Sequence, residues 1–262
     1  MQEGYIHIKK NKLYFKKFGY GPRLMIALHG FAHDHHMFNI FQEGLQSHFT
    51  VYAIDLPFHG RSQWKEKQYD PVAIQQMVGY ILQRENKDQF TALGFSFGAR
   101  IWMASLPHIQ QWISHLYLLA PDGLRTQWLG LAERTPQLFI LLLDQLSKKP
   151  NRLIHLADRL RKLGLINRFA HRFVHHHLST YKNKKRLFNT WRAIQKFRVN
   201  KRKVKNILLN SSIQLSVIVG KRDTLIGMGA IKKLVKGLPN AQLHLLNKSH
   251  FLIDGSIVPL IR

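Results

Sequence analysis

The sequence predicts an α/β protein with a mostly parallel sheet, helices on both faces of the sheet and an all-helical insertion. Short apolar runs alternate with segments of helical periodicity up to about residue 123, and this alternation returns from about residue 211. Between them, over residues 124–210, strand signals are absent. Alternating strands and helices are typical of a parallel sheet covered by helices on both faces. We therefore expect a core formed by residues 1–123 and 211–262, with residues 124–210 inserted as helices.

The first strands are predicted from period-two alternation and from short apolar runs. Residues 5–10 and 12–18 alternate between apolar and polar side chains, which is typical of an antiparallel hairpin. Residues 23–30 and 49–57 are apolar runs that indicate strands buried on both faces.

Helices and strands alternate in the next segment. Residues 71–86 place apolar side chains at helical spacing and begin with a proline, which suits the first turn of a helix. Residues 89–96 and 113–121 have the pattern of buried strands, and residues 98–107 between them favour a helix.

The insert is predicted to hold several helices. Thr135-Pro136 is typical of a helix start, and Asn151 and Asn167 suit the caps of two more helices. Leucines recur at helical spacing beside basic residues, at Leu153, Leu156, Leu160 and Leu163. After the insert, the pattern predicts a strand, a helix and a strand at 213–220, 227–237 and 241–247.

Ser96 is the strongest candidate for a reactive residue. It lies in the segment Gly94-Phe95-Ser96-Phe97-Gly98, at the predicted junction of a strand and a helix. Glycines two positions to either side permit a sharp turn, because side chains there would collide with neighbouring backbone. Ligands of open α/β sheets bind at the carboxyl edge of the strands, where this turn lies. The pattern therefore predicts that Ser96 is a nucleophile.

A serine nucleophile needs a base that takes its proton and an acid that orients this base. In this architecture the expected order along the chain is serine, acid and histidine. Asp223 and His250 each follow a predicted strand at the same sheet edge, and they are the preferred acid and base. Asp122 also follows a strand at this edge and is the alternative acid, although Pro-Asp-Gly is more common as a turn. Asp55 is expected to order a loop.

Two backbone N–H groups are candidates for the oxyanion hole. Phe31 follows His29-Gly30 at the end of a predicted strand, and Phe97 directly follows Ser96. N–H groups at these two places can stabilise the negative charge that develops on an attacked carbonyl. The phenylalanines and the leucine-rich insert favour a hydrophobic acyl pocket.

These features together resemble the α/β-hydrolase family over nearly the whole chain. The matching segments are LHGF (28–31), DLPFHGRS (55–62), GFSFG (94–98), VGKRD (219–223) and the late His250. The second segment departs from the usual D-x-P-G-x-G-x-S at Phe58. The resemblance implies an α/β-hydrolase fold with an eight-stranded sheet, a helical cap over residues 124–210, and Ser96, Asp223 and His250 as a catalytic triad.

The predicted function is a carboxylesterase-like serine hydrolase that cleaves an ester of a hydrophobic acyl group through an acyl-enzyme. The alternative is a thioesterase or esterase that acts on acyl groups carried by acyl carrier protein, or on an anionic lipid as a lysophospholipase does. C–C bond hydrolysis and a non-catalytic binding role are less favoured. A serine nucleophile argues against the dehalogenase and epoxide hydrolase chemistry of this family, which relies on aspartate.

The net charge of +26 is concentrated in the insert. The segment from Lys148 to Lys205 holds 19 Lys and Arg residues and a single acid, Asp158. Such a segment is either a solvated helical surface or a docking surface for an acidic carrier protein or an anionic membrane. Nucleic acid is a less favoured partner because the sequence has no recognition motif for it.

Cysteine is absent, which excludes disulfides and a cysteine nucleophile, and the sequence predicts no cofactor. Histidines gather around Asp34 and again at His171 and residues 175–177. Histidines four residues apart share a helix face and can bind metals, but we expect no carboxylate near the second group and predict no metal site. No apolar stretch is long enough for a signal peptide or a membrane span, so we expect a soluble, cytoplasmic protein, with peripheral membrane association as an option.

Overall fold

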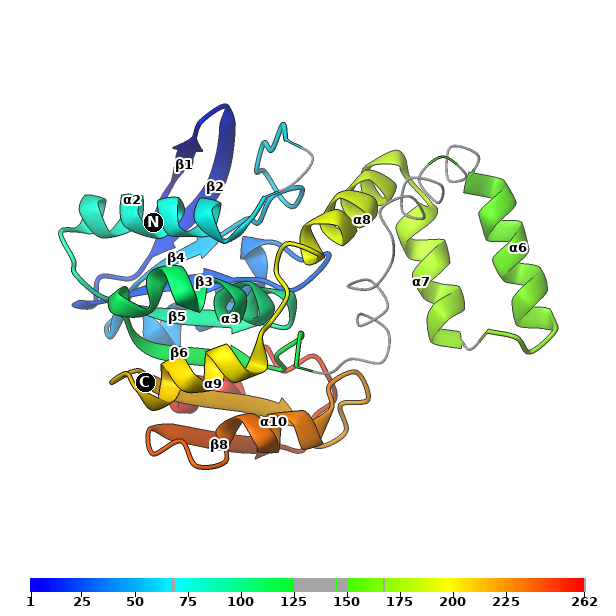
Figure 1. Ribbon diagram of the computed structural model, residues 1–262. Helices are drawn as coiled ribbons and strands as arrows, with labels where there is room; N and C mark the ends of the chain where they lie inside the picture. The colour runs from blue at the N-terminus through cyan, green and yellow to red at the C-terminus, as the bar shows by residue number, and fades with distance from the viewer. Residues whose placement is uncertain (67–68, 125–144, 146–149, 167, 262) are drawn as a thin grey trace.

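An eight-stranded sheet runs through the centre of the molecule (Figure 1). The computed structural model describes residues 1–66, 69–124, 145, 150–166 and 168–261. The strands lie in the order β1-β2-β4-β3-β5-β6-β7-β8; β2 pairs antiparallel with β1 and with β4, and the other pairs are parallel. Their bounds are Gln2–Ile8, Asn11–Phe18, Arg23–Leu28, Phe49–Ile54, Phe90–Phe95, Ile113–Leu119, Gln214–Gly220 and Ala241–Leu246 for β1 to β8. The predicted mostly parallel sheet of eight strands is confirmed.

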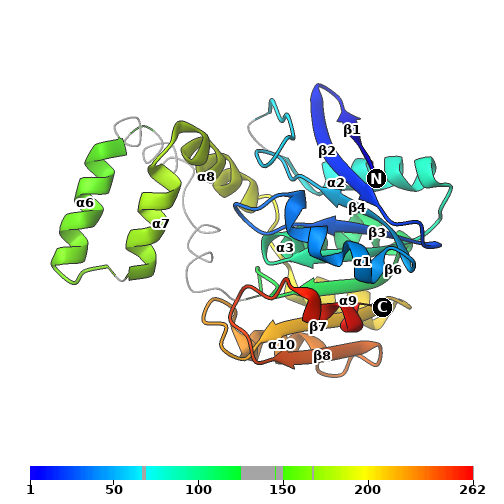
Figure 2. The ribbon, with the colours of Figure 1, turned by 180° about the vertical axis from the view of Figure 1, so that it is seen from behind.

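Helices cover both faces of this sheet, as predicted. The face seen in Figure 1 carries α2 (Pro71–Glu85), α3 (Phe97–Ile109), α9 (Lys201–Leu209) and α10 (Met228–Val235). The opposite face, seen in Figure 2, carries α1 (Gln42–Leu45) and two 3-10 helices, η1 (His35–Phe41) and η3 (Gly255–Leu260). A third 3-10 helix, η2 (Gln110–Trp112), follows α3.

The central parallel strands are buried on both faces, which explains why their sequences are continuously apolar. Every residue of β5 is buried, and so is every residue of β7 after Gln214. β5 lies between β3 and β6, so its carboxyl end falls in the middle of one sheet edge. The chain turns from β5 into α3 at this edge, and the residue at the turn is Ser96.

The start of α2 shows how local sequence determines an element. The Asp70 side chain accepts hydrogen bonds from the N–H groups of Val72 and Ala73, and Pro71 occupies the first helical position. The helix ends at Glu85, and the left-handed φ of 50° at the next residue, Asn86, terminates the helical backbone.

Within the insert, α6 (Pro150–Lys162), α7 (Arg168–Leu178) and α8 (Tyr181–Ile194) extend away from the sheet (Figures 1 and 2). The next helix, α9, returns to the core and packs against α3, with Val204 and Leu208 buried. The expected insert of 124–210 therefore includes a helix that covers the sheet. An absence of strand signal does not separate a covering helix from a cap helix.

Two of the predicted helix boundaries, Thr135-Pro136 and Asn167, lie outside the described residues. α6 begins at Pro150, so the cap predicted at Asn151 falls inside its first turn. Proline is well accepted at the first position of a helix. Among the residues that the structure describes, no helix has the length and apolar character needed to cross a membrane.

Candidate active site

Ser96 stands between β5 and α3 in a strained backbone conformation. Its φ is 49° and its ψ is −106°, a region that costs a residue with a side chain roughly 1–3 kcal/mol. The Ser96 N–H donates to the carbonyl of Leu119 at 2.8 Å, and the Ser96 carbonyl accepts from the N–H groups of Arg100 and Asp122, each at 3.2 Å. These bonds from α3 and β6 hold the turn in place.

The two glycines that flank Ser96 are required by close backbone contacts. A Cβ added to Gly98 would lie 2.1 Å from the carbonyl oxygen of Leu28, and one added to Gly94 would lie 2.6 Å from the nitrogen of Ala99. Both distances are far inside van der Waals contact, so a larger residue would force the turn to move.

His250 joins Ser96 to Asp223 through two hydrogen bonds. Its Nε2 lies 3.0 Å from the Ser96 Oγ, and its Nδ1 lies 2.7 Å from the Asp223 Oδ2. When the Nδ1 proton is donated to the carboxylate, Nε2 is free to accept the proton of the serine hydroxyl. The Asp223 side chain is 1% exposed and that of His250 is 24% exposed, so the imidazole can be reached from solvent whereas the carboxylate cannot.

The turn after β7 keeps Asp223 in its charged form. Its Oδ1 accepts the N–H groups of Leu225 at 2.8 Å and Ile226 at 3.1 Å. Burial alone would raise the pKa of Asp223, but the hydrogen bond from His250 and these two backbone donors outweigh burial and hold the pKa below its usual value. The carboxylate is thus ionised at neutral pH and can orient the imidazole.

The two predicted oxyanion donors come from segments that adjoin the Ser96 turn. Phe97 is the first residue of α3, where N–H groups have no acceptor within the helix and negative charge is favoured. Phe31 follows Gly30 in the loop after β3. A Cβ added to Gly30 would lie 2.7 Å from the Phe95 ring and 3.5 Å from the Ser96 Cβ, so this loop passes directly beside the Ser96 turn.

Two buried histidines hold the loop that contains Phe31, a structural role that the sequence pattern did not predict. His29 donates from Nδ1 to the carbonyl of Gly30 at 2.7 Å, and its Nε2 accepts the N–H of Leu56 at 3.0 Å. His59 accepts the N–H of Ala32 at 3.2 Å on its Nε2. Burial lowers the pKa of His29 to about 4 and that of His59 well below its usual value, so both rings are neutral and able to accept. Their presence within LHGF and DLPFHGRS was the only signal in the sequence.

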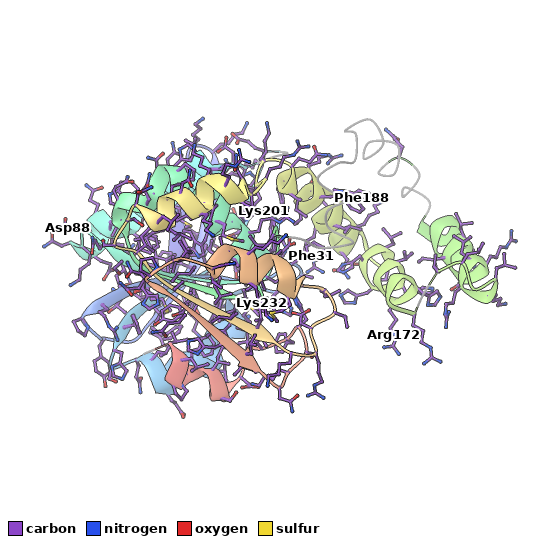
Figure 3. All side chains as sticks on the ribbon, turned by 60° about the horizontal axis from the view of Figure 1, so that its bottom comes forward. Phe31, Asp88, Arg172, Phe188, Lys201 and Lys232 are labelled. Carbon is purple, nitrogen blue, oxygen red and sulfur yellow. The ribbon has the colours of Figure 1, made fainter. Side chains whose placement is uncertain are left out.

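Phe31 also connects the core to the insert. Its side chain packs against Leu178, Leu187 and Phe188, and its ring centroid lies 5.0 Å from that of His177. Figure 3 shows Phe31 on the side of the core that faces α8, with Phe188 on that helix. Apolar side chains of the insert therefore lie next to the loop that passes beside Ser96.

A cation on α8 adds positive charge to this side of the core. The Arg186 Nε is buried and has no hydrogen-bond partner among the described residues, while its Nη2 donates to the Asn183 Oδ1 at 3.1 Å. Burial lowers the pKa of Arg186, and the nearby charge of Asp34 opposes this shift. Burial also lowers the pKa of His33, and the Arg186 charge adds to that effect. The charge of Arg186 on the insert therefore acts on titratable groups in the loop of residues 31–36.

Asp55 orders the loop between β4 and α2, as expected from the sequence. Its Oδ1 accepts the backbone N–H of His35 at 2.7 Å and the His35 ring Nδ1 at 2.8 Å, and its Oδ2 accepts the N–H of Arg61 at 2.8 Å. Phe58, which replaces the usual glycine of this segment, adopts a left-handed φ of 70°. The chain keeps the glycine-type turn here despite a bulky side chain.

Asp122, the alternative acid, is engaged by Arg100. The Arg100 guanidinium donates to both carboxylate oxygens, from Nε at 2.7 Å and from Nη2 at 3.0 Å. Arg100 is 0% exposed and Asp122 is 1% exposed, so each charge is matched by the other in the interior. The carboxylate that is hydrogen-bonded to the His250 imidazole belongs to Asp223 and not to Asp122.

The two histidine groups differ in their surroundings. In the first, the Asp34 Oδ1 accepts both the backbone N–H and the ring Nδ1 of His36, while the His35 ring is held by Asp55. We expected no carboxylate near the second group, and this expectation is wrong. The carboxylate of Asp158 on α6 is hydrogen-bonded to His171 and His175 on α7. The carboxylate was missed because 13 positions separate it from His171.

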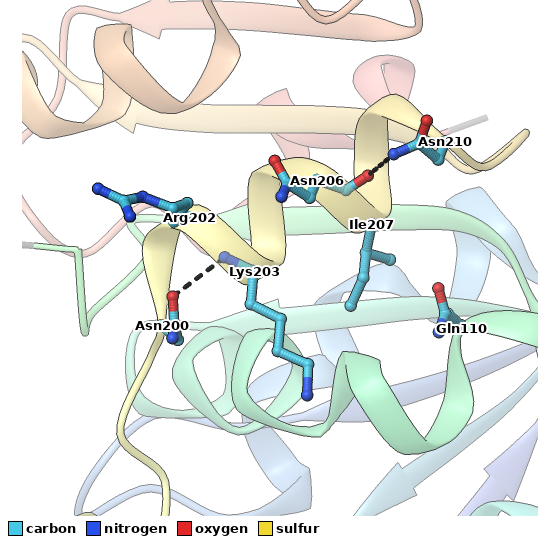
Figure 4. Close-up of a pocket in the computed structure, with 7 residues that line it drawn as sticks. All are labelled: Gln110, Asn200, Arg202, Lys203, Asn206, Ile207 and Asn210. Atoms are coloured by element: carbon cyan, nitrogen blue, oxygen red, sulfur yellow. Dashed lines mark hydrogen bonds between the residues drawn. The ribbon is translucent and has the colours of Figure 1, made fainter.

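A hollow of about 400 Å³ lies beside α9 (Figure 4). It is lined by Gln110, Asn200, Arg202, Lys203, Asn206, Ile207 and Asn210. Gln110 follows the 13 residues of α3, and Ser96 precedes them, so about 20 Å of helix separates the two. This hollow is therefore distinct from the Ser96 site.

Solved structures share the fold of this chain. An esterase from Exiguobacterium antarcticum has a TM-score of 0.65 and 17% sequence identity, covering 95% of this chain and 92% of that chain. An alpha/beta hydrolase fold protein from Burkholderia ambifaria has a TM-score of 0.70 and 13% identity, covering 98% and 96%. At these low sequence identities, the similarity shows a shared fold and nothing about activity.

Two curated relatives are pimeloyl-[acyl-carrier protein] methyl ester esterases. The protein from Citrobacter koseri is 27% identical over 158 residues, which is 59% of this chain and 58% of that protein. The protein from Proteus mirabilis is 29% identical over 91 residues, which is 35% of this chain and 33% of that protein. The matched region thus spans 58% of the first relative and a third of the second.

A family model described as the alpha/beta hydrolase fold matches residues 23–255. The matched segment includes Ser96, Asp223 and His250 together with the loop after β3. The strand order, the turn at Ser96 and this match lead to one conclusion: the chain belongs to the alpha/beta hydrolase fold family.

Proposed function

We propose that this protein hydrolyses carboxylic esters through an acyl-enzyme, with Ser96 as nucleophile, His250 as general base and Asp223 as the acid that orients the base. The observation that carries the proposal is the unbroken line of hydrogen bonds from the Ser96 hydroxyl through the His250 imidazole to the Asp223 carboxylate. A hydroxyl is a weak nucleophile at neutral pH, and this arrangement removes its proton as the bond to the carbonyl carbon forms.

The first step adds the Ser96 Oγ to the ester carbonyl and moves its proton to the His250 Nε2. Negative charge develops on the carbonyl oxygen, and the N–H groups of Phe31 and Phe97 are the proposed donors to it. The ionised Asp223 stabilises the imidazolium that forms. The imidazolium then protonates the leaving alcohol, and the acyl group remains on Ser96.

The second step uses the same residues in reverse. His250 takes a proton from a water molecule, which attacks the acyl-enzyme, and then returns this proton to the Ser96 Oγ as the carboxylic acid leaves. The 24% exposure of the His250 side chain is compatible with entry of that water.

The substrate class that we propose is an ester of an acyl group carried by an acidic carrier protein. Two relatives are named as esterases of an acyl-carrier-protein methyl ester. The segment from Lys148 to Lys205, with 19 basic residues and one acid, offers a cationic surface to such a partner. Arg186 brings one of these charges to the loop of residues 31–36. The apolar contacts of Phe31 with the insert suit an uncharged acyl chain.

The test measures the hydrolysis of two substrates by the wild-type protein and by the Ser96→Ala variant. One is p-nitrophenyl butyrate, and the other is a carrier-bound acyl methyl ester whose released methanol is measured. We expect wild type to cleave both and Ser96→Ala to cleave neither. Raising the salt to about 0.5 M should lower kcat/KM for the carrier-bound ester several-fold, because exposed charges are screened, and leave that for the neutral ester unchanged.

The two parts of the proposal can fail separately. Wild type and Ser96→Ala proteins with equal activity would refute the role of Ser96. Cleavage of the neutral ester with an identical salt response for both substrates would leave the triad standing and refute docking of the carrier. Release of the free acyl group from its thioester, with no release of methanol, would make the protein a thioesterase.

A further inference from the structure

Three metal-binding side chains converge between α6 and α7, outside the Ser96 site. The Asp158 Oδ1 lies 2.7 Å from the His171 Nε2 and 2.7 Å from the His175 Nε2. The atoms that these residues can offer to a metal all lie within 4.8 Å of one another. α6 and α7 are joined by a short connection and lie side by side (Figures 1 and 2).

Helix geometry accounts for the convergence. His171 and His175 are four residues apart on α7, so they project from the same face of the helix, and their ring centroids are 4.4 Å apart. Asp158 comes from the neighbouring helix and completes the set. The three side chains are 28%, 41% and 37% exposed for His171, His175 and Asp158, so an ion from solvent can reach them.

The contact of Asp158 with two histidines is notable because basic residues surround Asp158 in the sequence. Asp158 is the only acid between Lys148 and Lys205, where 19 Lys and Arg residues are available as partners. In the structure its Oδ1 nevertheless faces two imidazoles of the adjacent helix. Imidazole nitrogen and carboxylate oxygen are the donors that Zn²⁺ and similar transition-metal dications take from proteins.

We propose that Asp158, His171 and His175 form a binding site for a transition-metal dication of the Zn²⁺ type. Zinc binds imidazole nitrogen and carboxylate oxygen at about 2.0–2.2 Å in a tetrahedron, which places the donor atoms roughly 3.3 Å apart. The two distances of 2.7 Å from the Asp158 Oδ1 to the imidazole nitrogens then need to grow by only about 0.6 Å. The imidazoles bind as the Nδ1–H tautomer with the Nε2 lone pair on the metal, and the fourth position is open to water or to an anion.

The other histidine group does not offer an equivalent site. The His35 Nδ1 is bonded to the buried Asp55, and the Asp34 Oδ1 already caps the backbone N–H of His36. Those groups hold the loop beside the active site together, so ligation of a metal would require breaking its internal bonds. At the α6–α7 site, the hydrogen bonds that a metal would replace join the three proposed ligands to one another.

The proposed ion links two helices of the insert. It does not rest on the proposed esterase activity, and α6 and α7 extend away from the sheet that carries Ser96. Binding of an ion to the folded state only would stabilise the helix pair. We therefore expect it to stiffen the insert without taking part in ester chemistry.

The test uses the full chain without a histidine tag, stripped of metal with a chelator. Zn²⁺ is titrated by calorimetry, and Co²⁺ is added as a spectroscopic probe, because tetrahedral Co²⁺ absorbs strongly in the visible region. We expect one ion per chain, bound on the order of 1 µM or tighter. Asp158→Asn and the double variant His171→Gln/His175→Gln should each weaken binding by at least about tenfold.

His176→Gln is the matched control, because His176 lies on the same helix, is exposed and belongs to neither ligand group. It should bind as wild type does. Circular dichroism of the two ligand variants without metal shows whether their helices are intact. Equal binding by wild type and by folded ligand variants would overturn the proposal. So would an absence of binding by wild type at about 100 µM, or a loss of binding in a His35→Gln/His36→Gln variant instead.

Discussion

The His250 Nε2 lies 3.0 Å from the Ser96 Oγ although 154 positions separate the two residues. The contact depends on the loop after β8 being fixed against the turn after β7. The Arg222 N–H donates to the carbonyl of Lys248 at 3.0 Å, and the Arg222 guanidinium donates to the carbonyl of Asn247 at 2.9 Å. The loop that carries His250 is therefore bonded directly to the turn that carries Asp223.

Asp223→Asn should lower kcat by about 10³- to 10⁴-fold with little change in KM. The asparagine amide fits the same space but removes the negative charge, so it no longer holds the Nδ1–H tautomer or stabilises the imidazolium. Steady-state hydrolysis of p-nitrophenyl butyrate measures the effect. A variant that retained more than a tenth of the wild-type kcat would exclude Asp223 as the orienting acid.

Asp122→Asn is the matched variant at the alternative acid, and its effect should be on stability. It removes the negative charge from the carboxylate to which the buried Arg100 guanidinium donates, and breaking such a buried pair costs about 3–5 kcal/mol. Urea unfolding measures this loss. The kcat per folded molecule should stay within a few-fold of wild type, since Asp122 is bonded to Arg100. A fall in kcat as large as that of Asp223→Asn, in protein that is still folded, would favour Asp122 as the acid.

The strain at Ser96 predicts an unusual order of stability. Ser96→Gly should be more stable than Ser96→Ala by about 1 kcal/mol, because glycine accepts the φ of 49° without the cost that a Cβ carries. Both variants lack the hydroxyl, so both should be inactive, and the comparison isolates the backbone contribution. Urea unfolding of the pair provides the measurement. An alanine variant equal to or more stable than the glycine variant would show that the turn relaxes once the serine is removed.

The sequence was sufficient to predict the sheet and the three residues that meet at its edge. Apolar runs located each strand because central parallel strands are buried on both faces. Parallel strands place their carboxyl ends at one edge, so Ser96, Asp223 and His250 could be grouped from their positions after β5, β7 and β8. Their roles in catalysis stay predictions until they are tested.

Apart from the residues that meet at the sheet edge, contacts between segments distant in sequence were not predictable. His29 and His59 resemble ordinary loop residues in sequence, and only the fold brings them to the backbone groups around Gly30 and Ala32. Asp158 pairs with histidines of a different helix, and that helix pairing is not encoded in periodicity. α9 was assigned to the insert because helical periodicity does not reveal which surface a helix covers.

His115 predicts a dependence of stability on pH. Burial, with a contribution from the charge of Arg23, lowers the pKa of His115 to about 4, against 6.5 for the ordinary side chain. The folded state therefore disfavours the proton that the unfolded chain takes up below pH 6.5. The stabilising contribution is complete above pH 6.5 and is lost as the pH falls from 6.5 towards 4. His29 acts in the same direction, since its pKa is also lowered to about 4.

His115→Gln tests this contribution away from the active site. The His115 Nε2 lies 2.9 Å from the Ser216 Oγ, and glutamine offers that hydroxyl a polar partner as well. Between pH 6.5 and 4 the unfolding free energy of wild type should fall more steeply than that of the variant, by up to about 1.4 kcal/mol per pH unit for one proton. Urea unfolding at a series of pH values gives both curves. Parallel curves would mean that His115 takes up its proton equally in both states.

The last prediction concerns two basic residues of α8, Lys185 and Arg186, and their effect on the carrier-bound substrate. Lys185 is exposed, and Arg186 is half-buried, with its charge close enough to influence Asp34. The double variant Lys185→Gln/Arg186→Gln should raise KM for a carrier-bound ester several-fold and weaken its dependence on salt, because fewer charges attract the acidic partner. The activity on p-nitrophenyl butyrate should change much less. Kinetics at low and high salt with both substrates measure the difference.

Lys87→Gln provides the control for a change of charge alone. Lys87 is exposed and precedes β5, so it lies at the amino edge of the sheet, opposite the edge that carries Ser96. This variant should keep the wild-type KM and salt dependence for both substrates. If it weakened turnover of the carrier-bound ester as much as the α8 variant, the attraction would come from the overall positive charge of the chain. Docking would then be spread over the whole surface, and α8 would have no special place in it.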